Sequence, residues 1–186
     1  MVRPLRLRAV WLLIVPFFWW ARPTGEALVI GGSLALLGLW LRGWAAGVID
    51  KNRKLAVTGP YAFTRHPLYL GTLLLGLGVA MAGGHWVWPA LFFCFYAVAY
   101  GTTMASERAR MTELFGAHFE EYAAHVPALL PRLTPWRGTV GGGWAAAGEP
   151  TGFNWARYVK NREWEAAMGT GAGFAVLVAK WALGTG

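Results

Sequence analysis

Charged residues are scarce in this chain. Of its 186 residues only 14% are charged, whereas 56% are hydrophobic and the mean hydropathy is +0.39. An ordinary soluble domain carries about 25% charged residues, which coat the outer face of each element. Cysteine is scarcer still, with one residue, and this excludes a disulfide scaffold. Because 15% of the residues are aromatic, intrinsic disorder is excluded as well. The composition therefore predicts a small integral membrane protein.

The charges that are present are mostly positive. The chain has 17 Lys and Arg residues against 9 Asp and Glu, which gives a net charge of +8. A basic balance can indicate nucleic-acid binding, but here the basic residues lie between the apolar runs. In that position they meet the anionic headgroups of lipids. We therefore expect a membrane-embedded protein without a nucleic-acid partner.

Long apolar runs predict membrane-spanning helices, each of which needs about 20 residues. No Asp, Glu, Lys or Arg occurs between His66 and Ser106, a stretch long enough for two spans and a turn at Gly83-Gly84-His85. Another run contains Arg42, which lies near a helix end and can snorkel to the headgroups. The predicted spans of good length are 27–49, 67–83, 86–106 and 166–184.

The first apolar run, 5–21, is shorter and contains Pro16. A signal peptide would also have basic residues before such a run, but no small-residue cleavage site follows it. We therefore predict a tilted or kinked span.

Five spans with a cytoplasmic N-terminus agree with the distribution of basic residues. The segments 1–8, 42–65 and 107–165 then face the cytoplasm and hold 15 of the 17 Lys and Arg residues. This asymmetry is what the positive-inside rule requires. The predicted fold class is all-α, a polytopic membrane protein of about five transmembrane helices with a cytoplasmic amphipathic helix. It forms a single membrane domain over residues 1–186.

The segment 55–71 carries the most chemical information, and it leads from the cytoplasmic side into the span 67–83. Pro67 suits the first turn of a helix, so Arg65 and His66 lie just before a helix N-terminus. The free N–H groups and the dipole at such a terminus favour an anion. Tyr69 and Gly71 follow within about one turn, and a glycine there leaves room for a ligand to approach the backbone.

Glu107-Arg108 is the second feature, at the cytoplasmic end of the span 86–106. A hairpin of two spans returns Glu107 to the membrane face that carries Arg65 and His66. An ionisable residue at that depth suggests a functional role. A structural salt bridge between Arg65 and Glu107 is the alternative.

Three further cytoplasmic segments are recognisable by composition. Residues 113–122 predict an amphipathic helix, whose apolar stripe either covers a site or anchors the helix at the membrane surface. Residues 138–152 are rich in glycine and predict a flexible linker. Residues 154–163 either help to select an acceptor or form an aromatic and basic interface anchor.

Metal and nucleophile chemistry is not indicated. The histidines lack the spacing of metal ligands, so no metal is expected; they are His66, His85, His118 and His125. Cys94 lies in the middle of a predicted span among phenylalanines, where a thiol stays protonated and inert.

Several of these motifs together match one family. The sequence resembles the isoprenylcysteine carboxyl methyltransferase family, whose wider group includes the phospholipid N-methyltransferases. The matching motifs are Gly59-Pro60-Tyr61, Arg65-His66-Pro67-Leu68-Tyr69-Leu70-Gly71, Glu107-Arg108, and Phe115-Gly116 ahead of Tyr122. The resemblance covers about residues 50–132, and the RHPxYxG run is its most specific part. The family often has two adjacent acids where this chain has Glu107-Arg108, so the role of the second acid is not carried over.

The resemblance implies an S-adenosylmethionine-dependent transferase whose cofactor pocket is built by the cytoplasmic segments 50–66 and 107–165. The residues that it assigns to the cofactor are Arg65, His66, Pro67, Tyr69, Gly71 and Glu107. Arg65, His66 and the helix N-terminus can hold the cofactor's carboxylate, and Glu107 can accept hydrogen bonds from its ribose or amino group. A nearby aromatic ring, from Tyr61, Phe63 or Tyr69, can face the sulfonium.

The identity of the methyl acceptor stays open at this point. Because predicted membrane helices flank the site, we expect the acceptor to enter from the bilayer, as a lipid or a lipid-anchored molecule would. A prenylcysteine-like carboxylate calls for a cationic clamp, for which Arg108, Arg132 and Arg162 are candidates. A phospholipid-like amine must lose a proton, which calls for Glu107 or a histidine as the base. Glu107 and Arg108 are therefore the catalytic candidates. A nicotinamide-dependent membrane reductase of the sterol reductase type and a non-catalytic membrane protein are the alternatives.

Overall fold

A computed structural model describes residues 13–50, 55–138 and 152–185, and every regular element in these ranges is helical. Residues 13–20 form a short helix at the start of the described chain. The elements that follow are α2 (Gly25–Val48), the 3-10 helix η1 (Gly59–Ala62), α3 (Pro67–Ala82), α4 (Val87–Phe115), α5 (Ala117–His125), α6 (Trp155–Lys160) and α7 (Trp164–Ala182). The all-helical prediction is confirmed.

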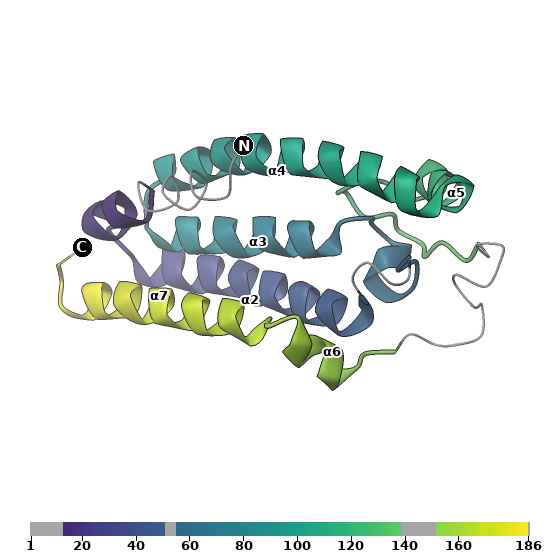
Figure 1. Ribbon diagram of the computed structural model, residues 1–186. Helices are drawn as coiled ribbons and strands as arrows, with labels where there is room; N and C mark the ends of the chain where they lie inside the picture. The colour runs from purple at the N-terminus through teal and green to yellow at the C-terminus, as the bar shows by residue number, and fades with distance from the viewer. Residues whose placement is uncertain (1–12, 51–54, 139–151, 186) are drawn as a thin grey trace.

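The long helices lie side by side along one axis (Figure 1). α3 lies between α4 and α2, and α7 lies along the other side of α2. The most extensive contact is between α2 and α3. α5, η1 and α6 gather at one end of the bundle, whereas the helix of residues 13–20 lies at the other end.

The apolar runs of the sequence form the long helices. α2 and α4 are both long and apolar enough to cross a bilayer, while α3 is an apolar helix of 16 residues. The predicted spans 27–49 and 67–83 fall on α2 and α3, and 166–184 falls on α7. The predicted span 5–21 lies partly outside the described residues, as does nearly all of the predicted linker 138–152.

α4 is longer than the predicted span 86–106, because its helix continues to Phe115. The prediction of a single amphipathic helix over 113–122 is therefore wrong, because these residues are divided between α4 and α5. The helix is broken at Gly116, whose φ of 54° is favourable for glycine and strained for other residues. α5 begins directly after this break, so the apolar residues of the stripe come from two helices.

Small residues let α2 and α3 approach closely. A Cβ atom added to Gly38 would lie 2.7 Å from the carbonyl oxygen of Gly71, and one added to Gly78 would lie 2.5 Å from the backbone nitrogen of Ala35. Such contacts between backbones are typical of helices that pack in a membrane. This contact fixes the position of α3, whose first turn carries the RHPxYxG run.

The sequence predicted that Arg42 snorkels from a helix end to the headgroups, and this prediction is wrong. Arg42 instead forms an ion pair inside the bundle. Its Nε and Nη2 atoms donate to the two carboxylate oxygens of Glu163, each at 3.0 Å, and its Nη1 donates to Thr72 Oγ1. Glu163 is 8% exposed. The expectation failed because Glu163, which precedes α7, lies 121 positions away in the sequence.

The segment before α7 caps the C-terminal end of α2. The backbone N–H of Asn154 donates to the carbonyl oxygen of Gly47 at 3.0 Å, and Asn161 Nδ2 donates to that of Ala46 at 2.8 Å. Arg157 Nη1 donates to the carbonyl oxygen of Val48 at 3.2 Å. The last carbonyls of a helix have no partner within the helix, so these bonds stabilise the end of α2.

Candidate functional site

The loop before α3 is held by a second segment that lies far away in the sequence. The backbone N–H groups of Arg65 and His66 donate to the carbonyl oxygens of Pro127 and Ala128, at 2.9 and 3.1 Å. Thr64 Oγ1, which is buried, donates to the carbonyl oxygen of Ala128 at 2.9 Å. The segment after α5 therefore positions the backbone of Arg65 and His66.

His66 is the N-cap residue of α3, and Pro67 occupies the first helical turn, as the sequence predicts. The ring of His66 stacks on the ring of Tyr69, with their centroids 5.2 Å apart. Tyr69 Oη donates a 2.8 Å hydrogen bond to Glu107 Oε2, which also lies 3.7 Å from His66 Nδ1. One carboxylate oxygen from α4 thus contacts two side chains from the start of α3.

These residues line a hollow of about 240 Å³ at one end of the bundle. Its polar lining comes from Tyr61, Arg65, His66, Tyr69, Glu107 and Tyr122. Its apolar lining comes from Ile49, Leu55, Ala56, Pro67, Leu68, Met111, Phe115 and Phe119. The hollow is therefore built jointly by the segment between α2 and α3, the first turn of α3, the C-terminal half of α4, and α5.

His66 is neutral at neutral pH. Burial lowers the pKa of its imidazole, and the positive charge of Arg65 lowers it further, while the carboxylate of Glu107 works in the opposite direction. The 3.7 Å approach of His66 to Glu107 is accordingly a contact between a neutral ring and a carboxylate. A neutral imidazole can still donate one hydrogen bond and accept another.

Arg65 keeps its positive charge beside the hollow. Burial lowers the pKa of its guanidinium, and so does the charge of Arg108, but arginine starts from so high a value that it stays protonated. No salt bridge to Arg65 occurs among the described residues. The Arg65–Glu107 salt bridge considered in the sequence analysis is therefore absent from the described part of the chain, where Glu107 contacts His66 and Tyr69 instead.

Two tyrosines form the deep wall. Tyr61 and Tyr122 are 5% and 2% exposed, and Tyr122 Oη donates to the carbonyl oxygen of Tyr61 at 2.7 Å. Burial raises the pKa of both phenols, so both keep their protons. Tyr61 Oη and Arg65 Nε are buried and have no hydrogen-bond partner among the described residues.

Five of the residues selected from the sequence line this one hollow: Arg65, His66, Pro67, Tyr69 and Glu107. Gly71 does not line it. A Cβ atom on Gly71 would lie 2.6 Å from Arg42 Cγ, so the glycine makes room for a side chain of α2 rather than for a ligand.

The three arginines proposed for the acceptor do not line the hollow either. Arg108 is 60% exposed and lies 3.8 Å from Glu120 on α5. Arg132 Nη1 donates to the carbonyl oxygen of His125 at 3.0 Å. Arg162 is 70% exposed and forms a salt bridge with Glu165.

Four further residues line the hollow although the sequence did not assign them to the site: Leu55, Met111, Phe119 and Tyr122. Tyr61, which the sequence offered as one of three rings for the sulfonium, lines it as well. A signal for two of the four existed, because Phe119 and Tyr122 belong to the amphipathic segment 113–122, which was expected either to cover a site or to anchor a helix at the membrane surface. Within the ranges that the structure describes, no group of three or more His, Cys, Asp or Glu residues could hold a metal ion.

Long apolar helices that end at a pocket with polar and aromatic walls are features of a helical membrane protein with a binding site near one membrane face. Residues 27–118 match the phospholipid methyltransferase family, and the chain belongs to this family, which also includes the isoprenylcysteine methyltransferases. The resemblance inferred from the motifs is therefore confirmed. The matched residues include the RHPxYxG run and Glu107.

The chain is similar to three curated relatives. The cobalt-zinc-cadmium resistance protein CzcN of Cupriavidus metallidurans is 39% identical over 123 residues, which are 64% of this chain and 55% of the relative. The nickel-cobalt-cadmium resistance protein NccN of Alcaligenes xylosoxydans xylosoxydans is 30% identical over 110 residues, 59% of this chain and 50% of the relative.

The protein-S-isoprenylcysteine O-methyltransferase of Schizosaccharomyces pombe is 32% identical over 84 residues, 45% of this chain and 36% of the relative. The matched part of the chain thus spans between about a third and about half of the length of these relatives. No solved structure matches the chain significantly.

Proposed function

We propose that this protein transfers a methyl group from S-adenosylmethionine to a lipid or lipid-anchored acceptor at the cytoplasmic face of a membrane. The observation that carries the proposal is the convergence of the RHPxYxG run with Glu107 on one hollow, from segments about 40 positions apart. Membership of a family that includes S-adenosylmethionine-dependent methyltransferases supports it.

The chemistry of the hollow fits this cofactor. A positive charge at Arg65, buried donors without a partner, a carboxylate at Glu107 and several aromatic rings lie around one space. The cofactor has a carboxylate, a ribose diol and a sulfonium that these groups complement. Arg65 and His66 would hold the carboxylate, Glu107 would accept from a hydroxyl or amino group, and the ring of Tyr69 would face the cation.

The cofactor supplies a methyl group on an activated sulfur. The protein's own contribution is then to hold donor and acceptor in line and to exclude water. Phe115, Phe119 and Leu55 form an apolar wall that serves the second purpose. The hydrogen bond from Tyr69 to Glu107 fixes the carboxylate, so that its remaining lone pairs point in a defined direction.

The proposed acceptor carries either a prenylcysteine-like carboxylate or a phospholipid-like amine. The names of the relatives do not single out one of these, since one is named for methylation of a prenylcysteine and two are named for metal resistance. An amine would need a base, for which Glu107 is in place at the hollow. Arg108, Arg132 and Arg162 remain proposals for a carboxylate acceptor and would have to reach it from outside the hollow.

Binding of S-adenosylhomocysteine to the purified protein in detergent, followed by calorimetry, tests the proposal. We expect micromolar binding that weakens at least about tenfold in His66→Ala and Glu107→Gln, because a hydrogen bond to a charged group contributes about 1.5–3 kcal/mol. Both variants should remain folded. His85→Ala, at the opposite end of the bundle, is the matched control and should bind as the parent does.

The alternatives predict other results. Binding of NADPH but not of S-adenosylhomocysteine would favour a reductase. Binding of neither ligand by a folded protein would favour a non-catalytic role for the same residues. After cofactor binding is established, transfer of a labelled methyl group to total membrane lipids and to a prenylcysteine analogue identifies the acceptor.

A further inference from the structure

Two hydrogen-bond donors that line the hollow have no partner among the described residues. They are Tyr61 Oη and Arg65 Nε. Tyr61 is 5% exposed and lines the hollow, so a molecule that occupies the hollow can supply the missing partner. Buried polar groups in native proteins are almost always hydrogen-bonded, because an unpaired one loses its hydration without compensation.

The other tyrosines of the hollow differ from Tyr61. Tyr69 Oη donates to Glu107 at 2.8 Å, and Tyr122 Oη donates to the backbone carbonyl of Tyr61 at 2.7 Å. The bond from Tyr122 holds the backbone of Tyr61 in place while leaving its hydroxyl unengaged. Tyr61 is therefore firmly positioned, and its hydroxyl is available to a ligand.

The two unpartnered atoms call for an acceptor of negative charge. Arginine has only donors, and the phenol of Tyr61 keeps its proton because burial raises its pKa. Arg65 also brings a positive charge that forms no salt bridge among the described residues, although Glu120 favours this charge from a greater distance. A ligand group that fits must accept from Tyr61 Oη, accept from Arg65 Nε and carry a negative charge. A carboxylate does all three, since its two oxygens accept from both donors and its charge compensates the guanidinium. An ammonium group would be repelled, and a neutral hydroxyl would leave the charge uncompensated.

We propose that Tyr61 Oη, together with Arg65 Nε, binds the carboxylate of the cofactor's amino-acid moiety. This inference rests on the proposed function and extends the binding site beyond the RHPxYxG run to η1. Gly59, with a φ of 59°, and Pro60 form the turn that directs Tyr61 inward.

The experiment compares two probes on the full-length protein in detergent: S-adenosylhomocysteine and 5′-methylthioadenosine, which keeps the nucleoside and the thioether but lacks the amino-acid moiety. Tyr61→Phe removes only the hydroxyl. We expect it to weaken binding of S-adenosylhomocysteine about 10- to 100-fold and to leave binding of methylthioadenosine unchanged. Arg65→Lys, which keeps the charge but removes Nε, should show the same selectivity.

The thermal stability of the ligand-free variants provides a second readout. Tyr61→Phe removes a hydroxyl that has no partner, so its melting temperature should equal or exceed that of the parent. Tyr122→Phe is the matched control: it removes a hydroxyl that is hydrogen-bonded, so its melting temperature should fall.

Three results would overturn the inference. Unchanged affinity of Tyr61→Phe for S-adenosylhomocysteine would show that the hydroxyl does not contact it. Equal weakening for both probes would place Tyr61 at the nucleoside instead of the carboxylate. If the parent protein binds S-adenosylhomocysteine and only the variant data disagree, the proposed function stands without this inference; if the parent does not bind it, both fall.

Discussion

Single residues at the start of α3 share one carboxylate. Tyr69 donates to Glu107 at 2.8 Å, and His66 lies 3.7 Å from the same oxygen. His66 is held neutral by burial and by Arg65, even though Glu107 favours the charged form. The surroundings of His66 therefore disfavour its protonation, and this makes the stability of the protein depend on pH.

The stability of the ligand-free protein should fall when the pH is lowered from about 6.5, the ordinary pKa of histidine. The pKa of His66 is lowered in the folded protein, so below pH 6.5 the unfolded chain binds a proton that the folded chain does not. Stability is therefore fully present above 6.5 and is lost as the pH falls through the lowered pKa. Melting temperatures between pH 7.5 and 5, for the parent and for His66→Asn, measure this loss.

His66→Asn should flatten the decline, because the group that takes up the proton is gone. His85→Asn removes an exposed histidine at the opposite end of the bundle and should keep the slope of the parent. Parallel curves for the parent and His66→Asn would contradict the assignment of a lowered pKa to His66.

The core of the site could be predicted from the sequence because its residues are either adjacent in the chain or related by a hairpin. Arg65, His66 and Tyr69 lie within five positions at a helix start, and Glu107 returns to them across two apolar runs of similar length. For Tyr61 the sequence predicted only that its ring is one of three that can face the sulfonium of the cofactor. Its unpartnered hydroxyl depends on the packing of η1 against α5, which no local pattern reveals.

Whole elements are joined by an ion pair that the sequence did not reveal. Arg42 on α2 donates to Glu163 before α7 and to Thr72 on α3. Thr72 Oγ1 in turn donates to the carbonyl oxygen of Leu68 at 2.8 Å, and Leu68 lines the hollow. The pairing could not be predicted because it depends on how α7 packs along α2, over 121 positions of sequence. The same limitation concealed the cap that Asn161 and Arg157 provide for α2.

Removal of one partner of this pair should destabilise the protein far more than removal of both. Arg42→Met or Glu163→Met alone leaves a buried charge without compensation, which costs about 3 kcal/mol or more. The double variant replaces the pair by apolar side chains of similar length and should recover most of that loss. Thermal unfolding of the two single variants and the double variant in detergent measures the coupling.

Arg162 and Glu165 provide a matched control, since they also form a salt bridge but are 70% and 47% exposed. Exposed pairs contribute about 0–1 kcal/mol, so Arg162→Met and Glu165→Met should have small effects. A double Arg42/Glu163 variant that is as unstable as the sum of its single variants would mean that the pair is not coupled.

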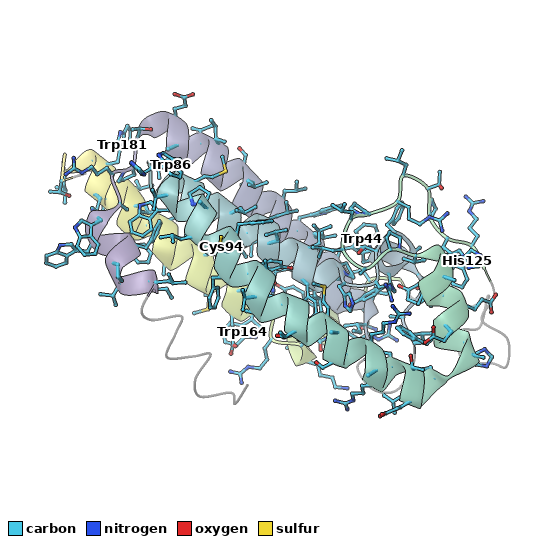
Figure 2. The ribbon with its side chains drawn as sticks, turned by 90° about the horizontal axis from the view of Figure 1, so that it is seen from above. Trp44, Trp86, Cys94, His125, Trp164 and Trp181 are labelled. Atoms are coloured by element: carbon cyan, nitrogen blue, oxygen red, sulfur yellow. The ribbon has the colours of Figure 1, made fainter. Side chains whose placement is uncertain are left out.

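On the scale of the whole molecule, large apolar side chains cover the outside of the helices. Trp40 and Leu36 on α2 are 61% and 67% exposed, and Val98 on α4 is 71% exposed. A soluble monomer rarely presents so much apolar surface, whereas a bilayer covers it favourably. Figure 2 shows Trp86 and Trp181 at one end of the molecule and His125 at the other, with Cys94 between them on α4.

This arrangement predicts a defined labelling pattern in intact cells. Cys94 is the one cysteine of the chain and is exposed on α4, so it faces lipid if α4 spans the bilayer. It should resist a charged, membrane-impermeant maleimide in both intact cells and lysed membranes. On a Cys94→Ala background, Trp86→Cys should react in intact cells, because the topology predicted from the basic residues puts the 83–86 turn outside. Glu121→Cys on α5 should react only after lysis, because the same predicted topology puts α5 and the hollow on the cytoplasmic side.

Each position tests a different part of the topology. The reverse pattern for Trp86→Cys and Glu121→Cys would place the hollow on the outer face and contradict the inference from the 15 basic residues assigned to the cytoplasmic side. Rapid reaction of Cys94 in membranes would mean that the middle of α4 is in contact with water. If Glu121→Cys reacts only after lysis, S-adenosylhomocysteine added outside intact cells should not reach the site. The proposed cofactor would then have to come from inside the cell.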